Sequence, residues 1–216
     1  SNNSSNNLNL WQGIVGGTQR YATPLNTSAQ GPNLLCPQEV TRMTTNKTTL
    51  TNAINGMVAD GNTVINQGLQ WGWNMISPRW RGMWGGTMNS NSLPLDYHTK
   101  GMNKAVVLLT DGENTIDNMN HSAYWYLADG RLGTTSSSAA VTQLNTRTAQ
   151  LCTAMKAQGI YIYTIALGTG VTTTAKNMLK ACATAENYYF NSPGTAQLQT
   201  VFSAIGDSLS NLRVSK

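Results

Sequence analysis

An aspartate that directly follows a short apolar run is the feature of this sequence most suggestive of chemistry. The run extends from Ala105 to Leu109 and is followed by Thr110, Asp111 and Gly112. An unbroken β-favouring run that ends at a turn is typical of a parallel strand buried on both faces. Ligands of open α/β sheets bind beyond the carboxyl ends of such strands. Because a lone carboxylate is costly to desolvate there, we expect Asp111 either to cap the following helix or to lie near a cation.

The sequence lacks the usual patterns of an enzyme. It contains no Gly-x-Ser-x-Gly elbow, no phosphate-binding loop and no His-Glu-x-x-His helix. Asp111 and Glu113 could form the carboxylate pair of a hydrolase, but alternate residues leaving a strand diverge, and exposure to solvent explains Glu113. A non-enzymatic function is therefore favoured.

Aromatic residues keep a second class of function open. The alternative is a secreted hydrolase or glycan-binding protein on an α/β scaffold that uses two aromatic loops, Trp80 to Trp84 and Tyr124 to Tyr126. Trp71 and Trp73 cannot share one face of a helix. We expect at most one of them to point inward, and the other to be covered by the segment 79–100.

Composition sets the broad class of the protein. A chain of 216 residues is long enough for one ordinary domain, and only 11% of its residues are charged. The formal net charge of +5 comes from basic residues scattered singly along the chain. A nucleic-acid surface needs a clustered basic stripe, so we expect no nucleic-acid partner. The longest apolar run is far shorter than the ~20 residues of a membrane-spanning helix, so we expect no membrane segment in this chain.

Apolar periodicity predicts strands that alternate with helices. Thr63 stands at the expected N-cap of the second helix, and Leu50, Ile54, Met57 and Val58 form a face of the first that should pack on a sheet. The predicted helices cover residues 47–59, 64–76, 144–158, 175–183 and 195–212, and the predicted strands cover 10–15, 105–109, 160–167 and 188–191. This order predicts an open, mostly parallel α/β sheet covered by helices on both faces.

Several sequence segments resemble one family. Lys104 to Asn114 is similar to the central strand and metal loop of a von Willebrand factor A domain. The segments 60–73, 77–78, 152–156, 159–166, 182–183, 188–191 and 202–213 occur in the order seen in TadG-like tight-adherence (Flp) pilus assembly proteins. The resemblance covers residues 36–216, and it implies a von Willebrand factor A or Rossmann-like fold. Residues 1–35 are then a polar N-terminal segment and loop.

The resemblance also implies a function and a metal site. Proteins of this family act in the bacterial cell envelope, on the periplasmic or extracellular face, with a membrane anchor near the N-terminus and other pilus assembly or envelope proteins as partners. Their metal-ion-dependent adhesion site combines an Asp-x-Ser-x-Ser loop, a threonine and an aspartate. Thr63 matches the threonine and Asp111 the aspartate. Hydroxyl and carboxylate oxygens suit Mg²⁺ or another divalent cation.

The first of these metal loops is missing from the sequence. No Asp-x-Ser-x-Ser occurs in the 216 residues. We therefore expect the chain to be the C-terminal part of a longer protein, without the first strand of the sheet, and Thr63 and Asp111 to be two parts of an incomplete site. For Thr63, a plain helix N-cap is the alternative.

The cysteines fit an exported protein. Cys36, Cys152 and Cys182 are too few and too widely spaced for structural zinc. Cys152 and Cys182 lie in predicted helices before and after one strand, and a disulfide between them would form in the periplasm if the two Cα atoms lie within ~7 Å. Two buried thiols are the alternative, and Cys36 has no evident partner.

Overall fold

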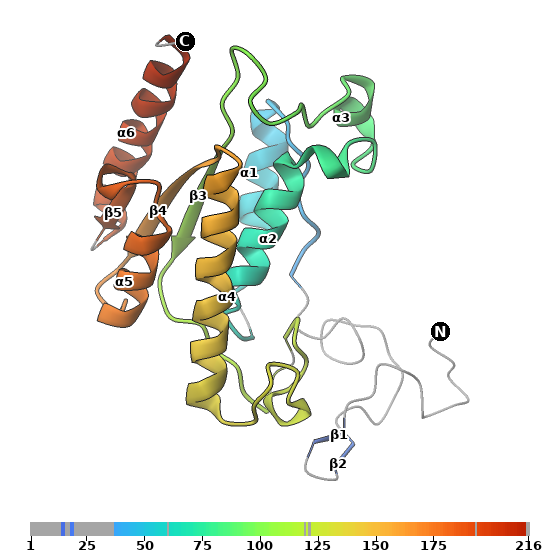
Figure 1. The fold of residues 1–216 in the computed structure, drawn as a ribbon, viewed down its shortest axis with the longest axis vertical. Helices are drawn as coiled ribbons and strands as arrows, with labels where there is room; N and C mark the ends of the chain where they lie inside the picture. Colours follow the sequence, from blue (N-terminus) through green and yellow to red (C-terminus); the bar gives the residue numbers. More distant parts are fainter. Residues whose placement is uncertain are drawn as a thin grey trace. The chain divides into compact units, whose positions relative to one another are not determined.

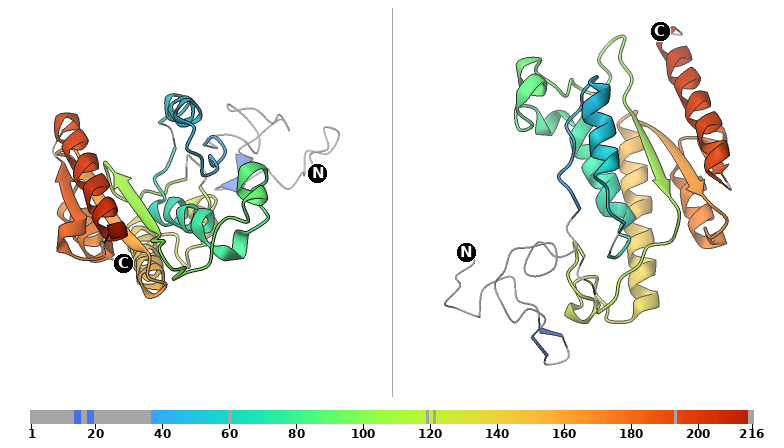
Figure 2. Two further views of the ribbon diagram at one scale, coloured as in Figure 1. Left: turned by 90° about the horizontal axis from the view of Figure 1, so that it is seen from above. Right: turned by 180° about the vertical axis from the view of Figure 1, so that it is seen from behind.

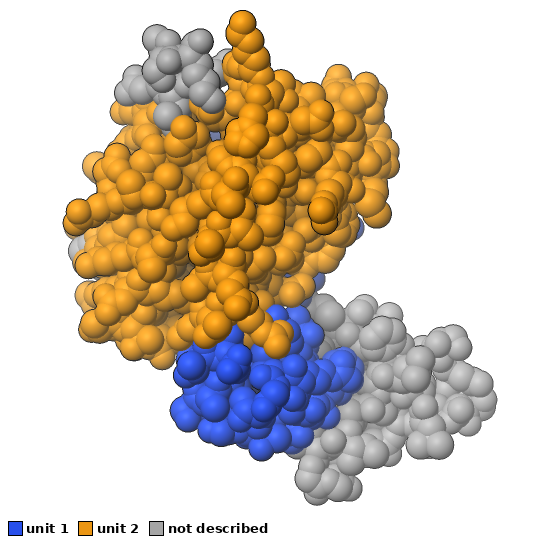
Figure 3. Space-filling model, viewed as in Figure 1, with its two compact units in different colours: residues 1–64, 114–143 blue, residues 65–113, 144–216 orange. Residues whose placement is uncertain are grey.

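The structure is a computed structural model that describes residues 14–15, 18–19, 37–59, 61–118, 120, 122–192 and 194–214, of which 14–15, 18–19 and 211–214 are described by their backbone alone. The chain divides into two compact units, which Figure 3 colours separately. Unit 1 comprises residues 1–64 and 114–143, and unit 2 comprises residues 65–113 and 144–216. The predicted boundary at residue 35 lies outside the described residues and stays a prediction.

Unit 2 contains a three-stranded parallel sheet. Its strands are β3 (Ala105–Thr110), β4 (Tyr161–Leu167) and β5 (Tyr189–Ser192), in the order β3-β4-β5 (Figure 1). Val107 lies opposite Tyr163, and Ile165 lies opposite Phe190. The second, third and fourth predicted strands and their parallel arrangement are therefore confirmed, which confirms the predicted α/β class.

Helices cover both faces of this sheet, as Figures 1 and 2 show. On one face, α2 (Ile65–Ile76), the part of α4 (Ser137–Ala157) that belongs to unit 2, and α5 (Thr173–Cys182) enclose apolar clusters around Ile162 and Ala166. On the other face, α6 (Thr195–Val214) packs over Tyr163 and Ile165. The short helix η4 (Glu186–Tyr188) leads into β5. Alternate side chains of the buried strand β4 thus reach two different helical layers.

One face of β3 is not covered, contrary to the prediction that this strand is buried on both faces. Val107 is 38% exposed and Leu109 is 40% exposed. Their side chains point to the α6 side of the sheet, but α6 contacts β4 and β5, and of the β3 residues only Ala105 adjoins its apolar cluster. The prediction is wrong because β3 is the edge strand of this sheet, beyond the reach of α6.

The segment 79–100 is ordered and packed down, as predicted. It begins within η2 (Pro78–Trp80) and contains the short helix α3 (Gly86–Ser90). Met88 is 1% exposed. The Arg81 guanidinium donates to the Pro94 carbonyl at 2.8 Å and forms an ion pair with Asp96 at 2.6 Å. These contacts fix both ends of the segment.

Unit 1 contains α1 (Lys47–Asn55), η3 (Leu127–Asp129) and the antiparallel pair β1 (Ile14–Val15) and β2 (Thr18–Gln19). The helix α1 ends at Asn55, earlier than predicted, with Gly56 as its C-cap. Leu50, Ile54, Met57 and Val58 are all exposed. The prediction that they pack on a sheet is wrong, because no described residue covers them. Among the described helices, none is both long and apolar enough to cross a bilayer.

Candidate functional site

Asp111 lies at the carboxyl end of β3 and is exposed. The preceding residue, Thr110, closes the turn with its hydroxyl, which accepts from the Gly112 backbone N–H at 3.3 Å and donates to the Gly112 carbonyl at 3.1 Å. No helix begins directly after Asp111, and the next one along the described chain is η3, at Leu127. The alternative that Asp111 caps a following helix is therefore wrong. Its carboxylate is available at the ligand-binding edge of the sheet.

Glu113 is held at the same edge, where the sequence predicted only a solvent-exposed side chain. It is half-buried, and the Thr172 hydroxyl donates a hydrogen bond to its Oε1. Thr172 is the N-cap of α5, and its hydroxyl also accepts from the Ala175 backbone N–H at 3.2 Å. The sequence does carry a signal for this contact, because a threonine between β4 and α5 lies at the carboxyl end of β4, next to that of β3.

Thr63 is exposed and lies in a loop of unit 1 that is hydrogen-bonded to Thr115. Its backbone N–H donates to the Thr115 hydroxyl at 2.8 Å, and its carbonyl accepts from the Thr115 backbone N–H at 2.8 Å. The helix α2 begins at Ile65, two residues after Thr63. The N-cap role of Thr63 stays a prediction.

The two predicted metal ligands belong to different units, Thr63 to unit 1 and Asp111 to unit 2. Their joint binding of one cation stays a prediction. The donor types fit Mg²⁺, since both are hard oxygen ligands and both side chains are exposed. The described part of the chain holds no group of three or more His, Cys, Asp or Glu that could bind a metal ion. Two protein ligands are few for a stable site, so additional ligands are required.

A disulfide joins Cys152 in α4 to Cys182 in α5, with the two Cα atoms 5.1 Å apart. Each cysteine is 1% exposed. The predicted bridge is present, and the alternative of two buried thiols is wrong. Lys156 ties the same two helices, since its Nζ donates to the carbonyls of Ala181 and Ala183 at 2.9 and 3.2 Å. Cys36 lies outside the described residues.

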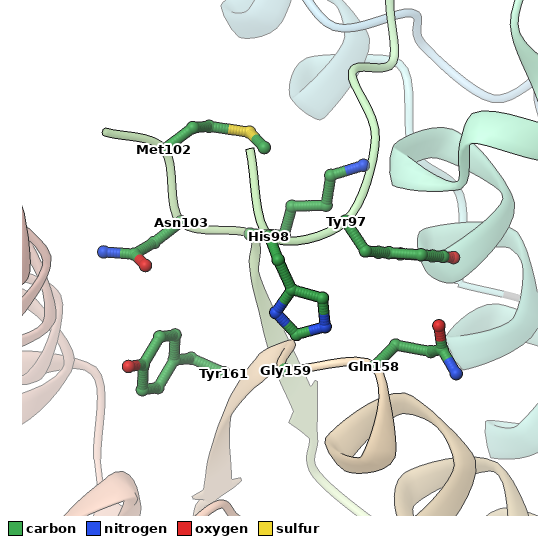
Figure 4. A pocket seen from close by; sticks show the side chains of 8 residues that line it. Tyr97, His98, Met102, Asn103, Gln158, Gly159 and Tyr161 are labelled. Carbon is green, nitrogen blue, oxygen red and sulfur yellow. The ribbon is translucent and has the colours of Figure 1, made fainter. Parts of the chain in front are cut away.

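A small cavity lies at the opposite edge of the sheet, at the amino ends of β3 and β4 (Figure 4). Its volume is about 130 Å³. The His98 imidazole lies against Gly159, whose φ of +72° is in the left-handed region. The other lining residues are Tyr97, Met102, Asn103, Lys104, Gln158 and Tyr161. Because it adjoins the amino ends of the strands, this cavity does not belong to the rim that carries Asp111.

The two aromatic loops of the alternative function, a hydrolase or glycan-binding protein, differ in their exposure, because Trp80 and Trp84 are both partly exposed. Tyr126 is 1% exposed, so the loop of Tyr124 to Tyr126 does not present it to a ligand. The prediction for the tryptophans of α2 is confirmed. Trp73 packs inward and donates from Nε1 to the Tyr97 hydroxyl at 2.8 Å, while Trp71 contacts Trp80.

The three-stranded parallel sheet and the helices that cover it define an α/β protein with an open parallel sheet. No protein-family profile matches the chain, and no curated protein matches it. Solved structures that are similar include proximal thread matrix protein 1 (PTMP1) from the mussel byssus, with 19% identity and a TM-score of 0.40 over 77% of this chain. A second crystal form gives a TM-score of 0.39, and a form with a zinc-occupied MIDAS motif gives 0.40, each at 19% identity over 73% of this chain. This chain spans only 27 to 29% of those chains, and the likeness is too low to carry a conclusion about it.

Proposed function

We propose that this chain is a non-enzymatic protein-binding domain that receives a further parallel β-strand along the outer edge of β3. The observation that carries the proposal is the uncovered apolar face at Val107 and Leu109. In the described sheet, β4 is the only neighbour of β3. The outer edge of β3 thus offers backbone donors and acceptors beside exposed apolar side chains.

Such an edge is unusual in a finished sheet. Parallel sheets occur almost only with both faces covered, because their strands are apolar on both sides. An unprotected edge strand is a template for another strand, and proteins use such edges to bind extended segments. β3 has no proline, bulge or charged side chain that would blunt its edge. A further strand, together with the helix or loop that follows it, would bury Val107 and Leu109.

The finer proposal follows the family resemblance. The completed domain is a von Willebrand factor A domain of a tight-adherence pilus assembly protein in the bacterial cell envelope, on the periplasmic or extracellular face. The membrane anchor and first strand lie upstream, and the partners are other pilus assembly or envelope proteins. The buried disulfide supports this location, because disulfides persist in oxidising compartments.

The proposed site also binds a divalent cation such as Mg²⁺. The added strand supplies the Asp-x-Ser-x-Ser loop, while Thr63 contributes a hydroxyl and Asp111 a carboxylate. A cation held by these residues would attract an acidic side chain of the partner protein. Within this chain, Thr63 and Asp111 would each contribute one oxygen ligand, and the carboxyl edge of the sheet would face the partner protein.

One substitution, made both in the full ectodomain and in residues 1–216 alone, tests whether a further strand lies along β3. Val107→Lys should lower the free energy of unfolding of the full ectodomain by at least about 2 kcal/mol, because it buries a charge beside the new strand. In residues 1–216 alone the same change should cost less than about 0.5 kcal/mol, since an exposed position tolerates it. The measurement is urea unfolding of both proteins.

Met83→Lys is the matched control, because Met83 is 68% exposed in the same unit and lies in a turn, not in a strand. It should have the same small effect in both proteins. An equally small effect of Val107→Lys in both proteins would rule out a strand at this edge.

A further inference from the structure

We propose that three tryptophans, Trp71, Trp80 and Trp84, form a binding site for an uncharged glycan. The indole rings follow one another in a row. The centroids of Trp71 and Trp80 are 5.4 Å apart in an edge-to-face arrangement, and those of Trp80 and Trp84 are 5.4 Å apart and stacked. All three side chains are partly exposed, and Met83, beside them in sequence, is 68% exposed. This tryptophan row is an apolar surface of a kind that soluble proteins usually reserve for binding.

The row is held rigidly. Trp71 belongs to α2 and Trp80 to η2, and the loop that carries Trp84 is closed by Asn89. The Asn89 side chain donates to the Gly82 carbonyl at 2.7 Å and accepts from the Gly85 backbone N–H at 2.9 Å. Rings that are already fixed lose little conformational entropy when a ligand stacks on them.

The composition of the segment that carries the row favours an uncharged, hydroxyl-rich ligand. Residues 61–95 contain no aspartate or glutamate, and their only basic residues are Arg79 and Arg81. Arg81 is engaged by Asp96. The other polar side chains of this segment are Asn, Gln, Ser and Thr, which both donate and accept hydrogen bonds. Sugar rings offer matching groups: hydroxyls at the edge, and flat C–H faces that the negative face of an indole attracts.

The tryptophan row also departs from what stability alone would favour. The Nε1 of Trp84 is enclosed and has no hydrogen-bond partner in the described structure. A buried donor without a partner costs about 1–3 kcal/mol, and violations of this kind concentrate at functional sites. This observation is independent of the ring geometry, and it indicates that Trp84 is kept in place for a reason other than folding.

The experiment uses residues 1–216 and two neutral probes, a β-1,4-linked glucose hexamer and a β-1,4-linked N-acetylglucosamine hexamer. At least one hexamer should bind saturably, with a change in tryptophan fluorescence and a heat of binding in calorimetry. Trp80→Ala should weaken that binding about five- to a hundredfold, because stacking on one ring contributes a factor in that range. Trp125→Phe, in unit 1, is the matched control and should leave the affinity unchanged.

Trp80→Phe and Trp84→Phe keep a ring in place and guard against loss of folding in the alanine variant. They should give smaller losses of affinity while circular dichroism stays unchanged. Absence of saturable binding to both hexamers overturns the proposal, as does equal affinity in all folded variants. Binding of a proline decapeptide or of phosphatidylcholine vesicles in place of the hexamers would assign the row to a peptide or to a membrane surface. Val107→Lys should not change hexamer binding, so this test and that of the β3 edge can fail separately.

Discussion

At the residue scale, the Cys152–Cys182 bridge closes a loop between two helices that cover the same face of the sheet. The cysteines are 30 residues apart in sequence. In the chain-entropy model, cross-linking a loop of that length lowers the entropy of the unfolded chain and thereby raises its free energy by about 3–4 kcal/mol. We therefore expect the Cys152→Ser/Cys182→Ser double variant to lose about that much free energy of unfolding. Urea unfolding under non-reducing conditions measures it.

Cys36→Ser is the control for this disulfide prediction, because it removes a cysteine without removing the bridge. It should leave the urea midpoint within error of the wild type. A double variant as stable as the wild type would show that the bridge does not restrict the unfolded chain as the entropy model requires.

Gly159 shows how one backbone conformation shapes the cavity edge. A Cβ added at Gly159 would lie 2.6 Å from Cε1 of His98, and the φ of +72° strains any other residue. His98 is exposed, so its ring can move away. Gly159→Ala should therefore cost about 1–2 kcal/mol, mostly through the backbone. Thermal unfolding of Gly159→Ala, His98→Ala and the double variant separates the two causes. A coupling energy above about 1 kcal/mol would assign the cost to the ring contact instead.

At the element scale, Lys104 connects the start of β3 to the segment 79–100 and to the end of α2. Its ammonium donates to the Ile76 carbonyl at 2.5 Å and to the Leu95 carbonyl, and it lies 4.6 Å from the Tyr97 ring centroid. Burial lowers the pKa of Lys104 below its ordinary value of 10.5; the nearby Arg81 lowers it further, and Asp96 partly opposes this. The cation thus has several partners but stays costly to desolvate.

This lowered pKa predicts a pH dependence. Between the lowered pKa and 10.5, the unfolded chain binds more protons at Lys104 than the folded chain does, so the free energy of unfolding should rise with pH. Burial raises the pKa of Tyr188 and Tyr189, so their contribution falls once the pH passes 10.0. Urea unfolding at several pH values from about 8 up to the ordinary lysine pKa of 10.5 should show this rise relative to a variant that keeps the two tyrosines but lacks the lysine.

Lys104→Met keeps the length of the side chain and removes the titrating group. Its free energy of unfolding should lack the rise caused by Lys104 and should follow the two tyrosines alone over the same pH range. An identical slope in the variant and the wild type would assign the rise to a group other than Lys104.

At the scale of the whole molecule, the predicted metal site needs residues from both units, with Thr63 in unit 1 and Asp111 in unit 2. In the full ectodomain, Asp111→Ala should weaken Mg²⁺ or Mn²⁺ binding at least about tenfold, and Thr63→Ala should weaken it less, because a neutral hydroxyl is a weaker ligand than a carboxylate. Calorimetric titration measures both affinities.

Thr63→Ser is the control for this prediction, since it retains the hydroxyl and should retain the affinity. If one ion binds both residues, the effects of Thr63→Ala and Asp111→Ala should also be non-additive in the double variant. Metal affinity that is unchanged by Asp111→Ala would remove this residue from the site.

The sequence by itself determined the strands of the parallel sheet and the helices that cover them. It also placed Asp111 at the carboxyl end of β3, because local apolar periodicity and turn residues encode these features directly. Pairing of Cys152 with Cys182 could be proposed from the order of the elements, but a disulfide needs two Cα atoms close in space, and only the structure supplied the 5.1 Å separation.

Only the tertiary structure decided which apolar faces are covered. Val107 has the same local sequence signal as a residue buried in the centre of a sheet, yet it is exposed, because burial depends on which strand lies at the edge and which helix reaches it. The Glu113–Thr172 contact and the row of Trp71, Trp80 and Trp84 likewise join positions far apart in the chain or on different elements. Such contacts follow from how the chain packs, which no local pattern specifies.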